Sequence, residues 1–144
     1  MSQLEQPVRT AFLFSALAAL LLTACRDTTS EVPLVSVDFQ INVNEPAFFD
    51  LAAPTGWLYA TGGSRGIIIY RNSQDEFTAL DRHATYDIQA GCAVTVADDG
   101  VILDDPCSDS QWLIIDGSVV TAPANQPLKQ YRTSFNDPYL RVFN

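Results

Sequence analysis

The chain has 144 residues, a formal net charge of −9 at pH 7 and 47% hydrophobic residues. So acidic a protein is repelled by nucleic acids and by anionic lipid headgroups, which excludes nucleic acid from its expected partners. The chain has one histidine and no recognisable Ser-His-Asp, paired-carboxylate or phosphate-loop arrangement, so nothing in it indicates an enzyme.

The N-terminus has the three-part pattern of a secretory signal. Arg9 precedes an apolar run over residues 11–21, and Thr23 and Ala24 precede Cys25. This ending resembles the lipobox of bacterial lipoproteins, in which a diacylglycerol is attached to the cysteine thiol and the chain is cut just before it. The run is too short for a membrane-spanning helix, which needs about 17–25 apolar residues. A plain cleaved signal and an anchor helix are the alternatives.

The lipobox implies three segments: a signal peptide over 1–24, a lipidated tether over 25–33 and a domain over 34–144. The mature chain of roughly 120 residues suffices for one domain, and it would bind the lipid membrane through Cys25. In Gram-negative sorting an aspartate after the lipidated cysteine favours the inner membrane. Arg26 follows Cys25 here, so we expect a cell-envelope protein of the outer membrane.

The mature part shows the pattern of β-strands. Over residues 35–43 apolar and polar residues alternate, as in a strand with one buried face. Short β-rich runs bounded by turn residues follow at 57–61, 66–71, 76–80, 92–96, 111–115, 118–121 and 139–143. Asp116-Gly117 predicts a two-residue hairpin, and 72–75, 98–100 and 136–138 predict other connections. The predicted class is all-β, an antiparallel sandwich or small barrel.

From about residue 34 onward, the order of features resembles a Rieske-type domain, and a closer resemblance is to lipoproteins of the Bacteroidetes type that carry one. In that family a small antiparallel β fold holds a [2Fe-2S] cluster between two loops, one with Cys-x-His and one with Cys-x-x-His. The segments that carry the resemblance are 66–71, 77–82, 105–112, 122–124 and 127–131.

The resemblance places different residues at the four ligand positions. Ala84 and Tyr86 stand where the family has Cys and His in its first loop, and Asp105 and Ser108 stand there in the second. Iron–sulfur clusters need thiolates, two of which are replaced by imidazoles in Rieske centres. We therefore expect the fold without the cluster, and no cofactor.

Two cysteines remain once Cys25 is lipidated. An envelope location favours disulfides, and some Rieske proteins carry an extra cysteine at the position of Cys107 that bridges to the first loop. The resemblance thus implies a Cys92–Cys107 disulfide, with two free buried thiols as the alternative.

Other candidate sites have simpler interpretations. Four residues are of types that bind metals: His83, Cys92, Asp105 and Cys107. Their spacing fits no known pattern, so we expect no metal site. We expect His83 to be an exposed or hydrogen-bonded loop residue. The aspartates between residues 87 and 128 are expected in turns, with a cation site as the alternative. The aromatic residues expected in the core or on a sheet face, with a ligand platform as the alternative, are Trp57, Tyr59, Trp112 and Phe143.

The leading hypothesis is a non-enzymatic envelope lipoprotein whose Rieske-like domain binds an unknown envelope protein or ligand, or has a structural role. The alternative is a Rieske [2Fe-2S] electron-transfer protein. A thiol–disulfide catalyst would need a close Cys-x-x-Cys pair or an activated thiolate, and the sequence shows neither.

Overall fold

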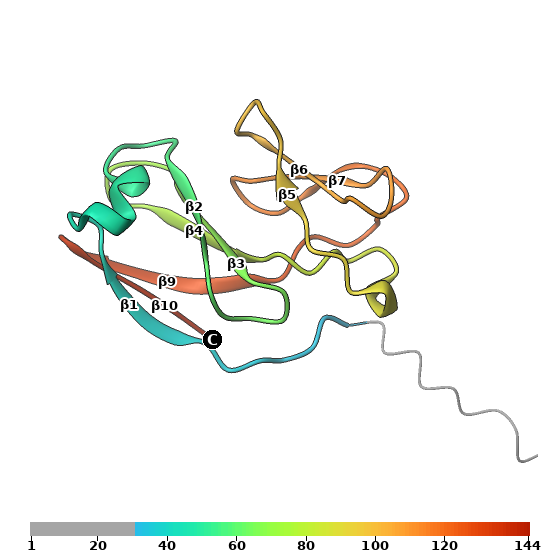
Figure 1. Cartoon of the computed structure of the whole chain (residues 1–144), viewed down its shortest axis with the longest axis horizontal. Coiled ribbons are helices and arrows are strands. Elements are labelled where there is room, and N and C mark those ends of the chain that lie inside the picture. Colours follow the sequence, from blue (N-terminus) through green and yellow to red (C-terminus); the bar gives the residue numbers. More distant parts are fainter. Residues whose placement is uncertain (1–30) are drawn as a thin grey trace, which may run out of the picture.

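The computed structural model describes residues 31–144, which form two antiparallel β-sheets (Figure 1). The predicted signal segment 1–24 and Cys25 lie outside the described residues. Within residues 31–144 no helix is long and apolar enough to cross a membrane. The prediction of an antiparallel all-β fold is confirmed.

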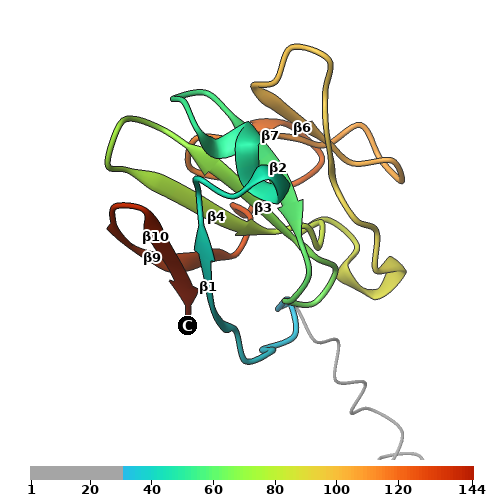
Figure 2. The same ribbon diagram turned by 60° about the vertical axis from the view of Figure 1, so that its left-hand side comes forward.

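The larger sheet has six strands and curls into a half-barrel. In spatial order they are β1 (Asp38–Asn42), β10 (Tyr139–Phe143), β9 (Gln130–Asn136), β4 (Phe77–Asp81), β3 (Ile67–Arg71) and β2 (Trp57–Ala60). The curl brings the two edges together: a Cβ on Gly62, just after β2, would lie 3.9 Å from the side chains of Val37 and Phe39 at β1. Figure 2 shows this curl from the side of β1, β9 and β10.

The smaller sheet is an insertion between β4 and β9. It contains β5 (Thr95–Val96), β6 (Ile102–Asp104), β7 (Gln111–Leu113) and β8 (Val119–Thr121), in that spatial order. Two short 3-10 helices, η2 (Pro46–Leu51) and η3 (Ile88–Ala90), lie in connections. In both ribbon views the smaller sheet stands beside the larger one, joined to it by the segments that leave β4 and enter β9 (Figures 1 and 2).

The hairpin of β3 and β4 separates two hydrophobic cores. Both strands are buried along their whole length, and successive side chains of a strand point to opposite faces. Ile67 and Ile69 therefore enter the core of the half-barrel, whereas Ile68 and Tyr70 enter the core beneath the smaller sheet. This double burial explains why the sequence of β3 is continuously apolar and not alternating.

Two strands and one turn differ from the sequence-based expectation. Strand β6 was not predicted, and β9 extends well beyond the segment 127–131. Asp116-Gly117 does not form a two-residue hairpin: β7 ends at Leu113 and β8 begins at Val119. The two-residue turn lies instead at Asp137-Pro138, because Asn136 pairs with Tyr139.

A buried arginine fastens the loops at one end of the half-barrel. Arg71 is 6% exposed, and its guanidinium donates hydrogen bonds to the carbonyl oxygens of Leu51, Ala52, Ser73 and Gln74. It also lies over the ring of Phe77, 5.0 Å from the centroid. Because these carbonyls come from η2 and from the β3–β4 turn, one side chain holds both segments to the sheet.

Candidate functional site

The two loops that the resemblance identifies lie next to each other. The first, residues 82–94, leaves β4 and returns toward β5, and it is closed by backbone hydrogen bonds from Ala84 N to Cys92 O (2.9 Å) and from Val94 N to Arg82 O (2.7 Å). The second, residues 105–110, joins β6 to β7. The structure therefore brings together two segments that residues 95–104 separate in the sequence.

The predicted disulfide joins the two loops. Cys92 and Cys107 are bonded, with their Cα atoms 6.3 Å apart and a sequence separation of 15. Cys107 is exposed and Cys92 is partly buried. The covalent link fixes the spacing of the loops without any bound group.

Hydrogen bonds close the second loop on itself. Asp105 is 5% exposed. Its Oδ1 accepts the backbone N–H of Cys107 at 3.0 Å, and its Oδ2 accepts the hydroxyl of Ser108 at 2.6 Å. Ser108 Oγ also lies 2.9 Å from Ser110 Oγ, which accepts the N–H of Ala124. Two of the four positions singled out from the sequence are thus bonded to each other.

The corresponding residues of the first loop differ from each other in burial. Ala84 is 1% exposed and packs in the core beneath the smaller sheet. Tyr86 is 42% exposed. The side chains at the four positions that the resemblance singles out therefore end in a methyl group, a phenol, a carboxylate and a hydroxyl.

The histidine is buried and hydrogen-bonded. His83 is 3% exposed, so the interpretation as an exposed loop residue is wrong and the hydrogen-bonded one is correct. Its Nε2 lies 2.9 Å from the carbonyl oxygen of Ile88, and its Nδ1 lies 2.8 Å from Ser64 Oγ. Because a carbonyl only accepts, we assign the proton to Nε2, and Nδ1 then accepts the serine hydroxyl. Both ring nitrogens have partners, so the ring of His83 is a structural support for the first loop.

A buried carboxylate that sequence reasoning missed organises the same region. The Asp81 side chain accepts hydrogen bonds from the backbone N–H groups of Ser64 (2.7 Å) and His83 (2.9 Å) and from the hydroxyl of Tyr131 (2.7 Å). Burial, and then the hydrogen bond to Asp81, raise the pKa of the Tyr131 hydroxyl above its ordinary value. The only sequence signal is an acidic residue at the end of a continuously buried strand.

The aspartates of the smaller sheet make turn hydrogen bonds. Asp99 Oδ1 accepts the N–H groups of Val101 and Ile102, and Asp116 Oδ1 accepts the N–H of Ser118. Bonds from the Ile102 and Val101 N–H groups hold the pKa of Asp99 below its usual range, and hydrogen bonds from Ser118 do the same for Asp116. These contacts support the interpretation of the aspartates as turn residues.

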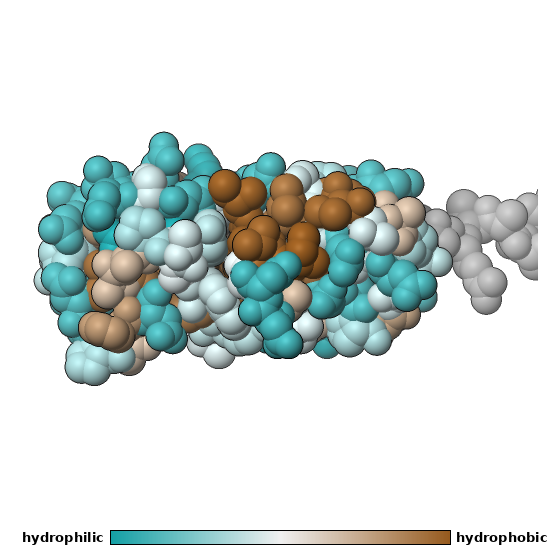
Figure 3. All heavy atoms as spheres, turned by 90° about the horizontal axis from the view of Figure 1, so that it is seen from above, coloured by the Kyte–Doolittle hydropathy of each residue, from teal (hydrophilic) through white to brown (hydrophobic). Residues whose placement is uncertain are grey.

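Hydrophobic side chains gather on the outer side of the smaller sheet. Trp112 faces inward and is fully buried. Ile102 pairs with Leu113 across β6 and β7. Each is next to an inward-facing residue of its own strand, so both side chains lie on the outer face of the sheet. Val101, Ile115 and Val120 in the same unit are each about half exposed, at 47%, 47% and 49%. Val120 also faces outward, because its neighbour Val119 packs against the inner core. The hydrophobic area over this sheet is seen in the space-filling view (Figure 3); we call Ile102, Leu113 and Val120 the apolar face.

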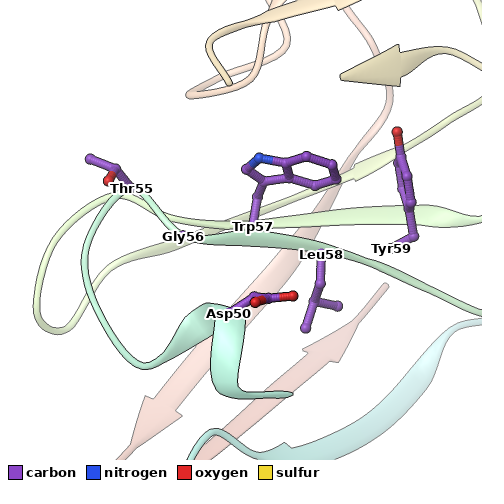
Figure 4. A pocket seen from close by; sticks show the side chains of 6 residues that line it. All are labelled: Asp50, Thr55, Gly56, Trp57, Leu58 and Tyr59. Carbon is purple, nitrogen blue, oxygen red and sulfur yellow. The ribbon is translucent and has the colours of Figure 1, made fainter. Parts of the chain in front are cut away.

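A groove of about 570 Å³ runs along β2, the edge strand of the larger sheet. Trp57 and Tyr59 rise from one side of the strand, and Leu58 and Asp50 lie on the other (Figure 4). The rings of Trp57 and Tyr59 meet edge to face at 5.1 Å, and Arg82 lies 4.0 Å from the centroid of the Tyr59 ring. The Tyr59 hydroxyl accepts the Val96 N–H, so this aromatic pair links the two sheets.

Among known proteins, neither a protein-family model nor a curated protein matches the chain, but solved structures do. The plasma membrane Rieske protein PetC3 from the cyanobacterium Synechocystis PCC 6803 is similar with a TM-score of 0.56 and 18% identity, over 72% of this chain and 99% of that chain. A chain from the complex of reduced oxygenase and oxidized ferredoxin in carbazole 1,9a-dioxygenase is similar with a TM-score of 0.51 and 14% identity, over 74% and 93%. Identities this low concern the fold alone, and the chain therefore has a Rieske-like antiparallel β fold.

Proposed function

We propose that this chain is a non-enzymatic lipoprotein of the cell envelope whose Rieske-like domain is a binding or structural module without an iron–sulfur cluster. One observation carries the proposal. Asp105 and Ser108 are hydrogen-bonded to each other in a loop that the Cys92–Cys107 disulfide ties to its neighbour. In a Rieske centre the cluster joins the two loops. Here the disulfide joins them, and hydrogen bonds close the second loop on itself.

The alternative is a Rieske [2Fe-2S] electron-transfer protein, which the likeness to Rieske structures favours. It would need four ligands. The thiols nearest the loops are joined in the disulfide, and both ring nitrogens of His83 are engaged in hydrogen bonds. The alternative therefore requires a large rearrangement of both loops.

Iron and sulfide content separates the two functions. The full-length chain is expressed with iron and cluster-assembly capacity and purified anaerobically in mild detergent, and a Rieske protein is prepared in parallel as a loading control. We expect a colourless chain with a β-type circular dichroism spectrum and negligible iron and acid-labile sulfide. Near-stoichiometric iron and sulfide, with a Rieske-type electron paramagnetic resonance signal after reduction, would establish the alternative.

The apolar face supports a binding role, and its surroundings indicate the partner. Residues 83–128 contain no Lys or Arg. Exposed or half-exposed aspartates of the smaller sheet and its loops are Asp98, Asp99, Asp104, Asp109 and Asp116. A second copy would bring the same negative charge to the contact, which opposes self-association. The partner that fits is a protein with an apolar contact surrounded by Lys and Arg side chains.

Site-specific photocrosslinking in cells tests this surface. A photoreactive amino acid at Val120, on the apolar face, should give a discrete adduct that Leu113→Ser weakens and that high salt also weakens. Mass spectrometry should identify an adduct partner with a basic surface. The matched control is the exposed Gln40 of β1. Equal adducts at both positions, an acidic partner or a crosslinked homodimer would contradict the proposal.

Location completes the proposal: residues 1–24 are removed, and lipid on Cys25 holds the domain at the outer membrane. These positions lie outside the described residues, and the proposal rests on the lipobox and on Arg26. Residues 31–37 then connect the anchor to β1.

A further inference from the structure

Three metal-binding groups meet where the two loops join. The Sγ atoms of Cys92 and Cys107 and one carboxylate oxygen of Asp105 all lie within 4.8 Å of one another. His83 does not belong to this set, because both of its ring nitrogens already have hydrogen-bond partners. The structure thus selects a set of two sulfurs and one oxygen.

The disulfide occupies both sulfurs, so the set becomes a ligand set only after reduction. A phosphine reductant and one water convert the disulfide to two thiols and the phosphine to its oxide. A divalent cation then displaces one proton from each thiol. Cys107 is exposed and Cys92 partly buried, so the reductant has access to the bond.

The spacing suits a tetrahedral cation. Zn–S bonds of about 2.3 Å and Zn–O bonds of about 2.0–2.2 Å place tetrahedral ligand atoms about 3.5–3.8 Å apart. The two sulfur atoms must separate, and a carboxylate oxygen of Asp105 already lies within 4.8 Å of both. Neutralisation of two thiolates and one carboxylate also favours a dication in this acidic part of the chain.

Hydrogen bonds already fix the orientation of the Asp105 carboxylate. The Cys107 N–H binds its Oδ1 and the Ser108 hydroxyl binds its Oδ2. Partners of this kind orient a ligand carboxylate and strengthen metal sites. Each carboxylate oxygen has a further lone pair for a metal.

We propose that the reduced chain binds one Zn²⁺ through Cys92 Sγ, Cys107 Sγ and the Asp105 carboxylate, with water as the fourth ligand. Metal binding and the disulfide exclude each other. The two loops are therefore linked by the disulfide in the oxidised chain and by the metal in the reduced chain. This inference goes beyond the proposed function, since it concerns a mononuclear site in the reduced state.

Cobalt titration tests the site. The full-length chain in mild detergent is reduced anaerobically with an immobilised phosphine and titrated with Co²⁺. We expect one Co²⁺ per chain, with thiolate-to-cobalt charge-transfer absorption and the intense d–d bands of tetrahedral coordination, all removed by Zn²⁺. The oxidised chain and the double variant Cys92→Ser/Cys107→Ser should show none of these bands. Asp105→Asn should weaken binding by about ten-fold or more, whereas the control Asp104→Asn should change it little.

Several results would overturn the proposal: no charge-transfer band in the reduced chain, equal binding by the oxidised chain, or unchanged affinity in Asp105→Asn. Circular dichroism of the reduced chain gives a second readout, because metal binding should raise its melting temperature. A reduced chain that is unfolded and that Zn²⁺ does not refold also contradicts the proposal. Iron and sulfide in the chain as purified would instead refute the proposed function, so the two failures are distinguishable.

Discussion

The hydroxyl of Ser108 donates a hydrogen bond of 2.6 Å to the nearly buried carboxylate of Asp105, two residues that the resemblance places at ligand positions. The first prediction concerns this bond. Ser108→Ala removes a donor from the carboxylate, and such a loss costs about 1–2 kcal/mol. Urea unfolding should show this decrease, whereas Ser134→Ala at an exposed position of β9 should have little effect. Equal stability of the two variants would show that the loop does not depend on the bond.

A second prediction concerns the disulfide. Cys92 and Cys107 close a loop of 15 residues, and a cross-link of that length contributes about 3 kcal/mol in the chain-entropy model. Reduction should lower the free energy of unfolding by about this amount. Mass spectrometry of a non-reduced tryptic digest should show the two peptides linked. Free alkylatable thiols at both positions in protein exported to the envelope would contradict the prediction.

A third prediction concerns the anchor. Cys25→Ala should abolish metabolic labelling with a radioactive fatty acid and release the chain from membranes, because no other residue would carry the lipid. Arg26→Asp should keep the label and shift the protein toward the inner membrane, which density-gradient fractionation of the two membranes measures. Undiminished labelling of Cys25→Ala would refute lipidation at this residue.

Much of the fold could be predicted from local sequence patterns, because those patterns reflect which side chains of a strand are buried. The alternation over 35–43 reflects a strand, β1, with one face on the core. Strand β9 has the same alternation, but only Tyr131 and Phe135 among its seven residues are hydrophobic, so the sequence pattern is weak. Strand β6 is three residues long in an aspartate-rich stretch, which is too short for a period to show.

The site was predicted less completely because its contacts are distant in sequence. The disulfide was expected from the envelope location and the resemblance, which name the residue types directly. The Asp81 network joins residues 17 and 50 positions away, Ser64 and Tyr131, and no local pattern records such partners. The glycine at position 63 is a local sign of this network. Its φ is +63°, and a Cβ there would come 2.5 Å from Asp81 Oδ2, so a larger residue would clash with the carboxylate.

A fourth prediction concerns Arg71, which the sequence showed only as the last residue of an apolar run. Arg71→Met keeps much of the side-chain volume but leaves carbonyl oxygens of η2 and of the β3–β4 turn without their donor. A loss of about 2–4 kcal/mol is expected for buried groups left unpaired. The control is Arg141→Met, which breaks the exposed ion pair with Asp38 and should have a much smaller effect. A comparable loss in both variants would refute the role of Arg71 as a fastening.

The last prediction is a pH dependence at the alkaline end. Burial and the Asp81 carboxylate raise the pKa of Tyr131, so the folded chain retains this proton at pH values where the unfolded chain releases it. The stabilisation is fully present below the ordinary tyrosine pKa of about 10 and is lost as the pH rises above it. Tyr131→Phe removes the ionisable group and one hydrogen bond to Asp81, so it should be less stable at neutral pH by about 1–2 kcal/mol but should lose less stability between neutral and strongly alkaline pH. The exposed Tyr139 provides the control, because Tyr139→Phe should keep the alkaline decline of the wild-type chain. Urea unfolding followed by tryptophan fluorescence at a series of pH values measures both effects, and parallel pH profiles for wild type and Tyr131→Phe would show that the hydroxyl is not held by the Asp81 network.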